Sequence, residues 1–246
     1  LVAEVEENNL SYKVKSERWA RWYSCSLCEQ EYHGVVACAL GWACWKTYVG
    51  RPETDTAPSA AMRVLGSGLS GADHYEDALS VEEANLSMLR RLGAPAESIL
   101  VAQSNLAVTY QKVGRLEDAL RINRDVYSRH LTLYGKEHKE TTIDALNYAT
   151  DLLRLERFAE AKALLRETLP VAHRILGENH DVPLGMRLKY AQALCLDPAA
   201  TLDNIREAVT TLEELERTAR RVLGGKYPTA VKIEESLQNA RATLRA

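Results

Sequence analysis

The chain has 246 residues, of which 46% are hydrophobic and 26% are charged, with a formal net charge of −3. This composition is typical of a folded globular protein and excludes a disordered chain. The 31 basic and 34 acidic residues form no basic stripe of the kind that nucleic-acid binding needs, so we expect no nucleic-acid partner. The longest apolar run, residues 35–45, is far shorter than the roughly 20 residues that cross a bilayer, so we expect no membrane span.

The chain begins with the acidic segment LVAEVEENN, which lacks the basic start of a secretory leader. We therefore expect a cytoplasmic, reducing location, in which cysteines are free thiols or metal ligands rather than disulfides. Residues 1–24 are interpreted as an N-terminal arm, in which residues 1–17 carry little pattern and are either a loose arm or the remnant of an upstream helix. Residues 25–57 form a separate Cys-rich cap or finger that includes a helix.

Four of the five cysteines fall in the stretch CSLCEQEYHGVVACALGWACW. Cys25 and Cys28 have the C-x-x-C spacing, which lets two thiolates on one tight turn bind one zinc ion. One structural zinc needs two more ligands, and we predict His33 and Cys38, with Cys44 as the alternative. Cys38 and Cys44 are separated by about 240° on a helix, so they cannot both face one ion if both are helical. In outline the stretch resembles treble-clef, RING-like or MYND-like fingers, but it lacks their second set of ligands.

Two other interpretations of this stretch stay open. A redox C-x-x-C pair usually lies at a helix N-terminus after a strand, and no clear strand precedes this one. The segment VVACALGWACWKTYVG also predicts a buried helix, because Val36, Leu40 and Ala43 form one stripe and Trp42 and Trp45 are neighbours on the helix surface. Such a helix would cap the helices that follow in the chain, with or without zinc.

Beyond residue 57 the sequence repeats itself with a period of 42 residues. Four landmarks recur at this offset: Asn105 and Asn147, Ala119 and Ala161, Gly135 and Gly177, His138 and His180. Several landmarks at one spacing indicate a repeat architecture. We predict a repeat array over residues 58–246, with four units at 58–95, 96–138, 139–181 and 182–227 and a capping helix at 228–245.

The apolar pattern of each unit predicts two helices. In the second unit Leu106, Tyr110 and Val113 recur at helical spacing, and a second apolar stripe starts at Leu116. Gly114 lies at the break, where a residue without Cβ can adopt the left-handed conformation that ends a helix. No segment alternates with a period of two, so we predict an all-α fold without a sheet. Stacked helix pairs bury one continuous core and leave a concave groove.

The motifs NLAVTYQKVGRLEDAL and LTLYGKEH resemble tetratricopeptide repeats (TPRs), and the 42-residue length is similar to the repeats of kinesin light chains. The resemblance covers residues 58–245 and implies a right-handed α-solenoid that acts as a non-enzymatic scaffold. Its expected partner is a protein or peptide segment, bound in the concave groove. An Asn on each first helix lies on that face in the related family, which implies a groove made by Asn105, Thr109, Asn147, Asp151 and Lys189.

Two further functions stay open: an adaptor whose zinc finger recruits a ubiquitin-type enzyme, and a regulator whose array senses a peptide for an attached effector. The GSGLSG stretch at Gly66, Gly68 and Gly71 matches a dinucleotide-binding pattern, but that pattern needs a preceding strand. Glycines within a helix cost about 1 kcal/mol each relative to Ala, so we expect a soft first unit or a broken helix there. His138 and His180 occupy equivalent turns and are expected to cap helices.

Overall fold

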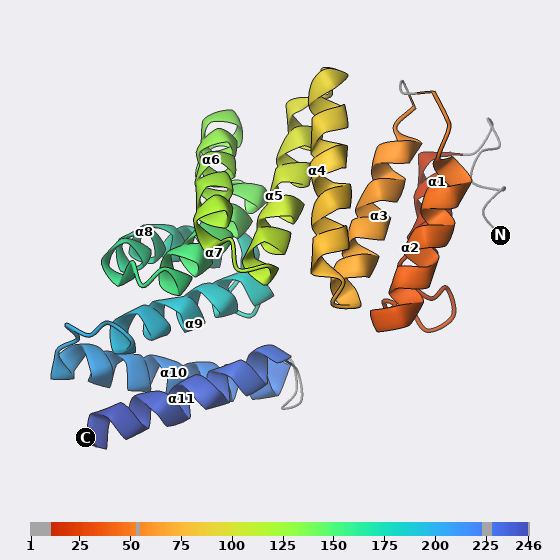
Figure 1. Ribbon diagram of the computed structural model, residues 1–246. Helices are drawn as coiled ribbons and strands as arrows, with labels where there is room; N and C mark the ends of the chain where they lie inside the picture. Colours follow the sequence, from red (N-terminus) through yellow and green to blue (C-terminus); the bar gives the residue numbers. More distant parts are fainter. Residues whose placement is uncertain (1–10, 53–54, 223–227, 246) are drawn as a thin grey trace. The chain divides into compact units, whose positions relative to one another are not determined.

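The fold is all-α in the computed structural model, which describes residues 11–52, 55–222 and 228–245 (Figure 1). Its helices are α1 (Tyr12–Ala20), α2 (Gly34–Tyr48), α3 (Ala57–Gly71), α4 (Tyr75–Arg91), α5 (Ala96–Lys112), α6 (Leu116–Tyr134), α7 (Lys139–Arg154), α8 (Phe158–Leu176), α9 (Asp181–Cys195), α10 (Leu202–Val222) and α11 (Pro228–Arg245). In these ranges the only strand-like pairing is an isolated antiparallel bridge between Ser24 and Glu31. The prediction of four helix pairs and a final helix is therefore confirmed. No helix in the described ranges is long and apolar enough to cross a membrane.

The turn between the two helices of a pair is built in the same way in three repeats. Asp73, Gly114 and Glu156 occupy equivalent positions and have positive φ angles of 63°, 81° and 58°. After Gly114, the Arg115 N–H donates to the Tyr110 carbonyl at 2.8 Å, and the other two turns make the same bond. This is the Schellman arrangement, which satisfies carbonyls at a helix C-terminus. Gly114 adopts the left-handed conformation freely, whereas the two acidic residues adopt it at a cost.

Histidines begin the first helices of two repeats, as the sequence predicts. Nδ1 of His138 accepts a hydrogen bond from the Glu140 N–H at 3.3 Å at the start of α7. Nδ1 of His180 accepts one from the Val182 N–H at 3.2 Å at the start of α9. Each ring therefore pairs one of the backbone donors that have no partner at a helix N-terminus. The expected capping role of both histidines is confirmed.

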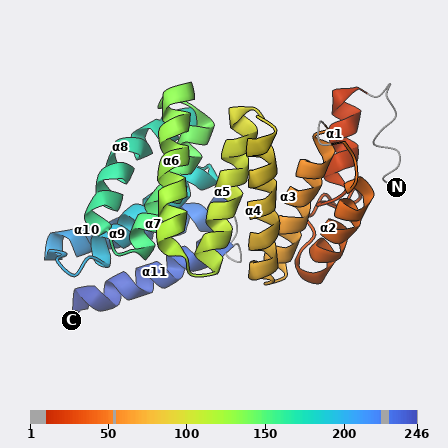
Figure 2. The same ribbon diagram turned by 45° about the horizontal axis from the view of Figure 1, so that its top comes forward.

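The helices group into two compact units, residues 1–115 and 116–246, which we describe separately. In the first unit each of α2, α3 and α4 packs against the next helix in the chain, as Figure 2 shows. Glycines allow α2 and α3 to approach closely. A Cβ on Gly68 would lie 2.6 Å from the Ala37 carbonyl oxygen, and one on Gly41 would lie 2.9 Å from Leu65 Cα. The expectation of a broken helix is wrong, because α3 runs unbroken and its glycines form a helix-packing surface.

Aromatic side chains attach the N-terminal helix α1 to α2. The ring centroid of Trp19 lies 5.1 Å from that of Tyr48, and the Trp22 centroid lies 6.4 Å from it in an edge-on arrangement. Such pairs add about 0.5–1.5 kcal/mol beyond the area that they bury. Cys44 completes this cluster and is fully buried. The predicted arm thus contains a short helix, which periodicity alone did not reveal.

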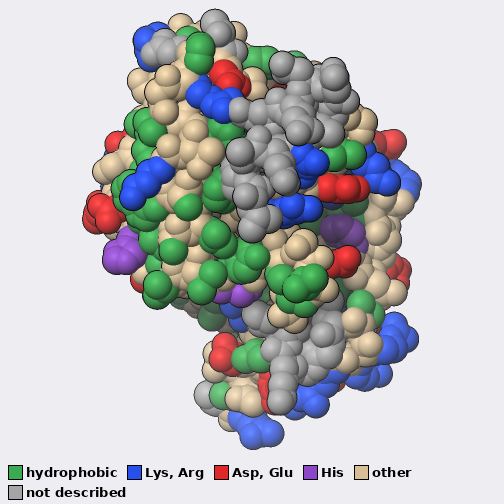
Figure 3. Space-filling model, turned by 90° about the vertical axis from the view of Figure 1, so that its right-hand side faces the viewer, with side chains coloured by type: hydrophobic (Ala, Val, Ile, Leu, Met, Phe, Trp, Pro, Cys, Tyr) green, Lys and Arg blue, Asp and Glu red, His purple; other side chains and the backbone are tan. Residues whose placement is uncertain are grey.

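Helix α2 carries apolar side chains on two sides. One side packs against α3, where Cys38 and Trp45 contact a buried cluster around Leu65. Elsewhere on the helix Val35 and Trp42 are exposed, at 81% and 43%. Figure 3 faces the end of the first unit that holds α1 and α2, and hydrophobic side chains gather there. The helix therefore resembles a core helix in composition while it keeps one face in solvent.

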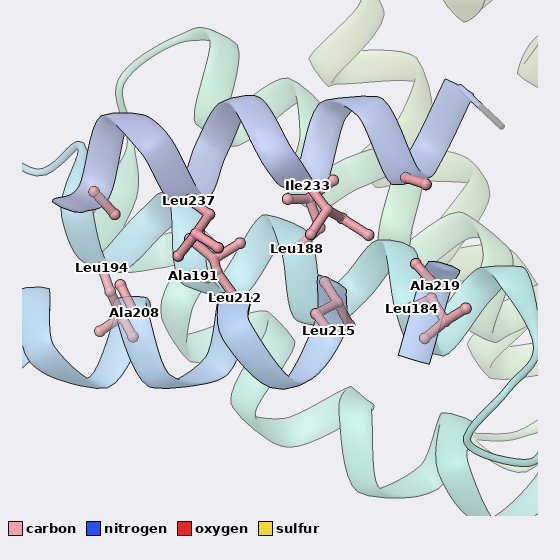
Figure 4. Close-up of a cluster of buried hydrophobic side chains, with 12 residues drawn as sticks. Leu184, Leu188, Ala191, Leu194, Ala208, Leu212, Leu215, Ala219, Ile233 and Leu237 are labelled. Atoms are coloured by element: carbon pink, nitrogen blue, oxygen red, sulfur yellow. The ribbon is translucent and has the colours of Figure 1, made fainter. Parts of the chain in front are cut away.

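The second unit has a core made by three helices. In Figure 4 Leu188 from α9 lies against Ile233 from α11, and Leu212 from α10 lies against Leu237 from α11. These four side chains are at most 3% exposed. Full burial of each such side chain contributes about 1.5–3 kcal/mol. Besides the contacts between successive helices, α7 contacts α9, and α9 contacts α11. The first helices of the repeats thus lie next to one another in this unit.

Candidate partner-binding surfaces

Two of the predicted groove residues are buried between helices. Thr109 is 1% exposed and Asp151 is fully buried, so the structure does not place either side chain on an open face. The Thr109 hydroxyl donates to the carboxylate of Glu82 on α4. In the next repeat the Asn123 amide on α6 donates to Asp151 Oδ2 at 2.5 Å. Both residues therefore join a second helix to the first helix of the following repeat.

The two predicted asparagines have a different environment. Asn105 on α5 and Asn147 on α7 are each partly exposed. Their side-chain amides make no hydrogen bond to the described part of the chain, although a carboxamide offers two donors and an acceptor. Asn105 belongs to the first unit and Asn147 to the second. Asn105 and Asn147 are therefore available to a ligand, one in each unit.

Lys189 lies in a cationic cluster on the first helices of the second unit. Burial lowers the pKa of Lys189, and the positive charges of Lys232 on α11 and Arg154 on α7 lower it further. Its Nζ donates to Gln192 Oε1 at 3.2 Å, and the Gln192 amide donates to Ser236 Oγ at 3.0 Å. No acidic side chain pairs with Lys189 in the described ranges. An anionic group would relieve the repulsion among these cations.

The first unit contains a pocket of about 510 Å³ that the sequence did not predict. We call it the N-terminal pocket; its lining comprises Trp19, Trp22, Tyr23, Glu31, Tyr32, His33, Ala37, Arg63, Val64, Ser67, Gly68, Gly71, Val101 and Asn105. A second cavity of about 660 Å³ lies among α3, α4 and α5, and Arg63 and Val101 line both. The two cavities therefore adjoin along the first helices of successive repeats, and the predicted residue Asn105 lies at one of them.

The C-x-x-C turn forms a small knuckle at the edge of this pocket. The Cys25 N–H donates to the Gln30 carbonyl at 2.8 Å, and Glu29 takes a positive φ of 58°. Hydrogen bonds from the backbone N–H groups of Cys28 and Leu27 lower the pKa of the Cys25 thiol, and the Cys28 thiol contributes in the same direction. The turn therefore brings two thiols together and favours, for Cys25, the thiolate form that metals and electrophiles require.

The other predicted zinc ligands are not gathered at this turn. Cys38 packs on the α3 side of α2, and Cys44 is buried so deeply that its pKa rises to about 12. Among the residues that the structure describes, no group of three His, Cys, Asp or Glu side chains could hold a metal ion. Cys25 and Cys28 thus lie together without His33, Cys38 or Cys44, and a bound zinc ion stays a prediction.

Comparison with known proteins supports the fold. Residues 98–172 match the tetratricopeptide repeat family. The TPR-like repeats of a Podosopora anserina protein assigned as a kinesin light chain are 19% identical, with a TM-score of 0.59 over 79% of this chain and 89% of that one. BtubC (BKLC) from P. vanneervenii is 15% identical, with a TM-score of 0.52 over 85% and 90% of the two chains.

A Rap protein solved in complex with Competence and Sporulation Factor is also similar. It is 13% identical, with a TM-score of 0.51 over 85% of this chain and 58% of that one. A search of curated proteins gives no match. At these identities the likeness concerns the fold, and it confirms the predicted similarity to kinesin light chain repeat arrays at that level.

Proposed function

We propose that this chain is a non-enzymatic protein-interaction scaffold that holds an extended segment of a partner protein against the first helices of its repeats. The observation that carries the proposal is a pair of side-chain amides, Asn105 on α5 and Asn147 on α7, that have no hydrogen-bond partner among the described residues. A carboxamide can donate to and accept from a peptide backbone at once. Repeats of this kind bind ligands on their extended inner surface.

The second unit adds a charge preference to this proposal. Lys189, Lys232 and Arg154 bring positive charge to the first helices α9, α11 and α7. A carboxylate on the partner would form charge-assisted hydrogen bonds there, and these are stronger than neutral ones. The similar Rap fold, solved with Competence and Sporulation Factor, shows that a helical-repeat protein of this architecture can form a complex. We therefore expect acidic residues in segments that bind the second unit.

The test is a selection of displayed random peptides against the purified chain, followed by affinity measurements on variants. Asn105→Leu and Asn147→Leu are expected to weaken the selected peptides while the helical circular dichroism signal stays unchanged. Ser128→Leu and Thr210→Leu are matched controls, because both side chains are exposed on second helices. Peptides that bind both asparagine variants as tightly as wild type would refute the proposed surface.

The adaptor alternative requires complete metal sites at the C-x-x-C knuckle, whereas a structural cap can form without them. Recruitment of a ubiquitin-type enzyme by a cross-braced finger needs two complete metal sites, each with four ligands. Of the five predicted ligands, Cys25 and Cys28 come together, and no group of three candidate ligands is found in the described ranges. The scaffold proposal is therefore the one that the described residues support.

A further inference from the structure

The N-terminal pocket holds two opposite charges that do not neutralise each other. Glu31, from the hairpin before α2, and Arg63, from α3, both line it. Neither side chain makes an ion pair or hydrogen bond within the described ranges, and both are exposed. Other charges of this unit do pair, as Arg51 does with Asp55 at 3.3 Å. A pocket that keeps an acid and a base apart suits a ligand that carries both signs.

The wall around Glu31 is aromatic. Tyr23 and Tyr32 lie opposite each other across the hairpin, where the Tyr32 N–H donates to the Tyr23 carbonyl at 2.9 Å, and Trp19 lines the same pocket. Aromatic faces carry negative electrostatic potential and attract cations, with about 0.5–1 kcal/mol at exposed sites. A carboxylate beside these rings adds to the attraction. This end of the pocket therefore favours a cationic side chain.

The residues of α3 and α5 that line the same pocket favour an anion and a peptide backbone. Arg63 can bind a carboxylate through two parallel N–H donors, which gives both strength and direction. Asn105 lies on the next first helix, and its amide makes no hydrogen bond to the residues that the structure describes. Small residues of α3, Ser67 and Gly68, also line the pocket, and small residues let a ligand backbone approach closely.

A buried donor also lines this pocket. Trp22 is 6% exposed, and its indole N–H has no acceptor among the described residues. An unmade hydrogen bond of a buried polar group costs about 1–3 kcal/mol. The wall thus combines aromatic surface, one carboxylate and one unmet donor, which is more than a solvated helix face offers.

We propose that the N-terminal pocket binds a peptide segment that carries a basic and an acidic residue. The lysine or arginine lies against Tyr23, Tyr32 and Glu31, and the aspartate or glutamate lies on Arg63. This inference rests on the proposed function and adds the charge pattern of the segment that the first unit recognises. It differs from the preference of the second unit, where Lys189 lies beside the positive charges of Lys232 and Arg154.

The test uses synthetic Gly/Ser host peptides that carry one Lys and one Glu at a series of separations, with fluorescence anisotropy as the measurement. At least one separation is expected to bind the wild-type chain, and its affinity should fall about tenfold in Glu31→Lys and in Arg63→Glu. Each variant should gain the matching peptide: Glu/Glu for Glu31→Lys, and Lys/Lys for Arg63→Glu. Lys46→Glu, on an exposed part of α2 that does not line the pocket, is the control.

A misfolded variant cannot gain affinity for the matching Glu/Glu or Lys/Lys peptide, so the reciprocal change supports the inference. Two results would overturn it: no Lys/Glu peptide binds wild type, or binding is indifferent to both charge reversals. The proposed scaffold function survives either result if peptides selected from the random library still depend on Asn105 or Asn147. The failure of the inference and the failure of the proposed function are therefore distinguishable.

Discussion

Glu82 gives the most quantitative prediction about stability. It lies on α4 at 7% exposure, between Gly66 on α3 and Thr109 on α5. Burial raises the pKa of its carboxyl from 4.5 to about 7, although the hydrogen bond from Thr109 acts in the opposite direction. Oε2 of Glu82 has no partner among the described residues. The next repeat has Asn123 at the equivalent position, so an uncharged amide suits this site.

The sign and size of the effect follow from the two pKa values. Well below pH 4.5 the carboxyl is protonated in both the folded and the unfolded chain, so its ionisation does not change the free energy of unfolding. As the pH rises, the unfolded state loses its proton first, and the free energy of unfolding falls until about pH 7. At about 1.4 kcal/mol for each pKa unit, the rise from 4.5 to about 7 costs about 3 kcal/mol. Glu82→Gln removes this cost, so it should stabilise the first unit at pH 8.

Hydrogen exchange of α3, α4 and α5, followed by mass spectrometry, measures this local stability directly. At pH 8 exchange in Glu82→Gln should be slower than in wild type by about two orders of magnitude, which corresponds to about 3 kcal/mol. At pH 5 the difference should shrink to about 1 kcal/mol or less. Glu235→Gln, an exposed glutamate of α11, should change nothing. An effect of equal size at both pH values, or destabilisation at pH 8, would refute the reasoning.

Three further predictions concern turns and cysteines. Asp73→Gly and Glu156→Gly should each stabilise the fold by about 0.5–1 kcal/mol in urea unfolding, because glycine adopts their positive φ without strain; a loss of stability would contradict the turn assignment. Cys25 and Cys28 should react with iodoacetamide in the native protein much faster than buried Cys44. Peptide mapping measures the three rates, and equal rates would contradict an accessible Cys25/Cys28 turn and a buried Cys44. Metal analysis of the purified protein should find about one zinc per chain. The variant Cys25→Ser/Cys28→Ser should lose both the zinc and the stability that it contributes, whereas a wild-type protein that is folded and reduced without zinc would contradict the prediction.

The repeat architecture was accessible from the sequence because its signals are local and repeated. The 42-residue offset located the helix pairs, and His138 and His180 marked helix starts through their own backbone contacts. Gly114 marked a turn for the same reason, since glycine is the residue that a left-handed position favours. Asp73 and Glu156 hold the same conformation without glycine, so only the repeat alignment reveals them.

The candidate sites were less accessible, because they depend on which side of a helix faces a neighbour. Thr109 and Asp151 share a helical stripe with Asn105 and Asn147, yet each is buried by a polar residue on a second helix. The sequence did hold a signal for this burial. Glu82 and Asn123 are polar residues at equivalent positions within the apolar stripes of two second helices, and each pairs with one of these residues. The N-terminal pocket had no such signal, because three segments far apart in the chain build it.

The most direct test of the scaffold account is photo-cross-linking with a selected peptide that carries a photoreactive residue. Cross-linked positions are then identified by mass spectrometry on the full chain. The account predicts cross-links on first helices, at α3 and α5 or at α7, α9 and α11, and their loss in Asn105→Leu or Asn147→Leu. Cross-links confined to the second helices α4, α6, α8 and α10 would contradict it.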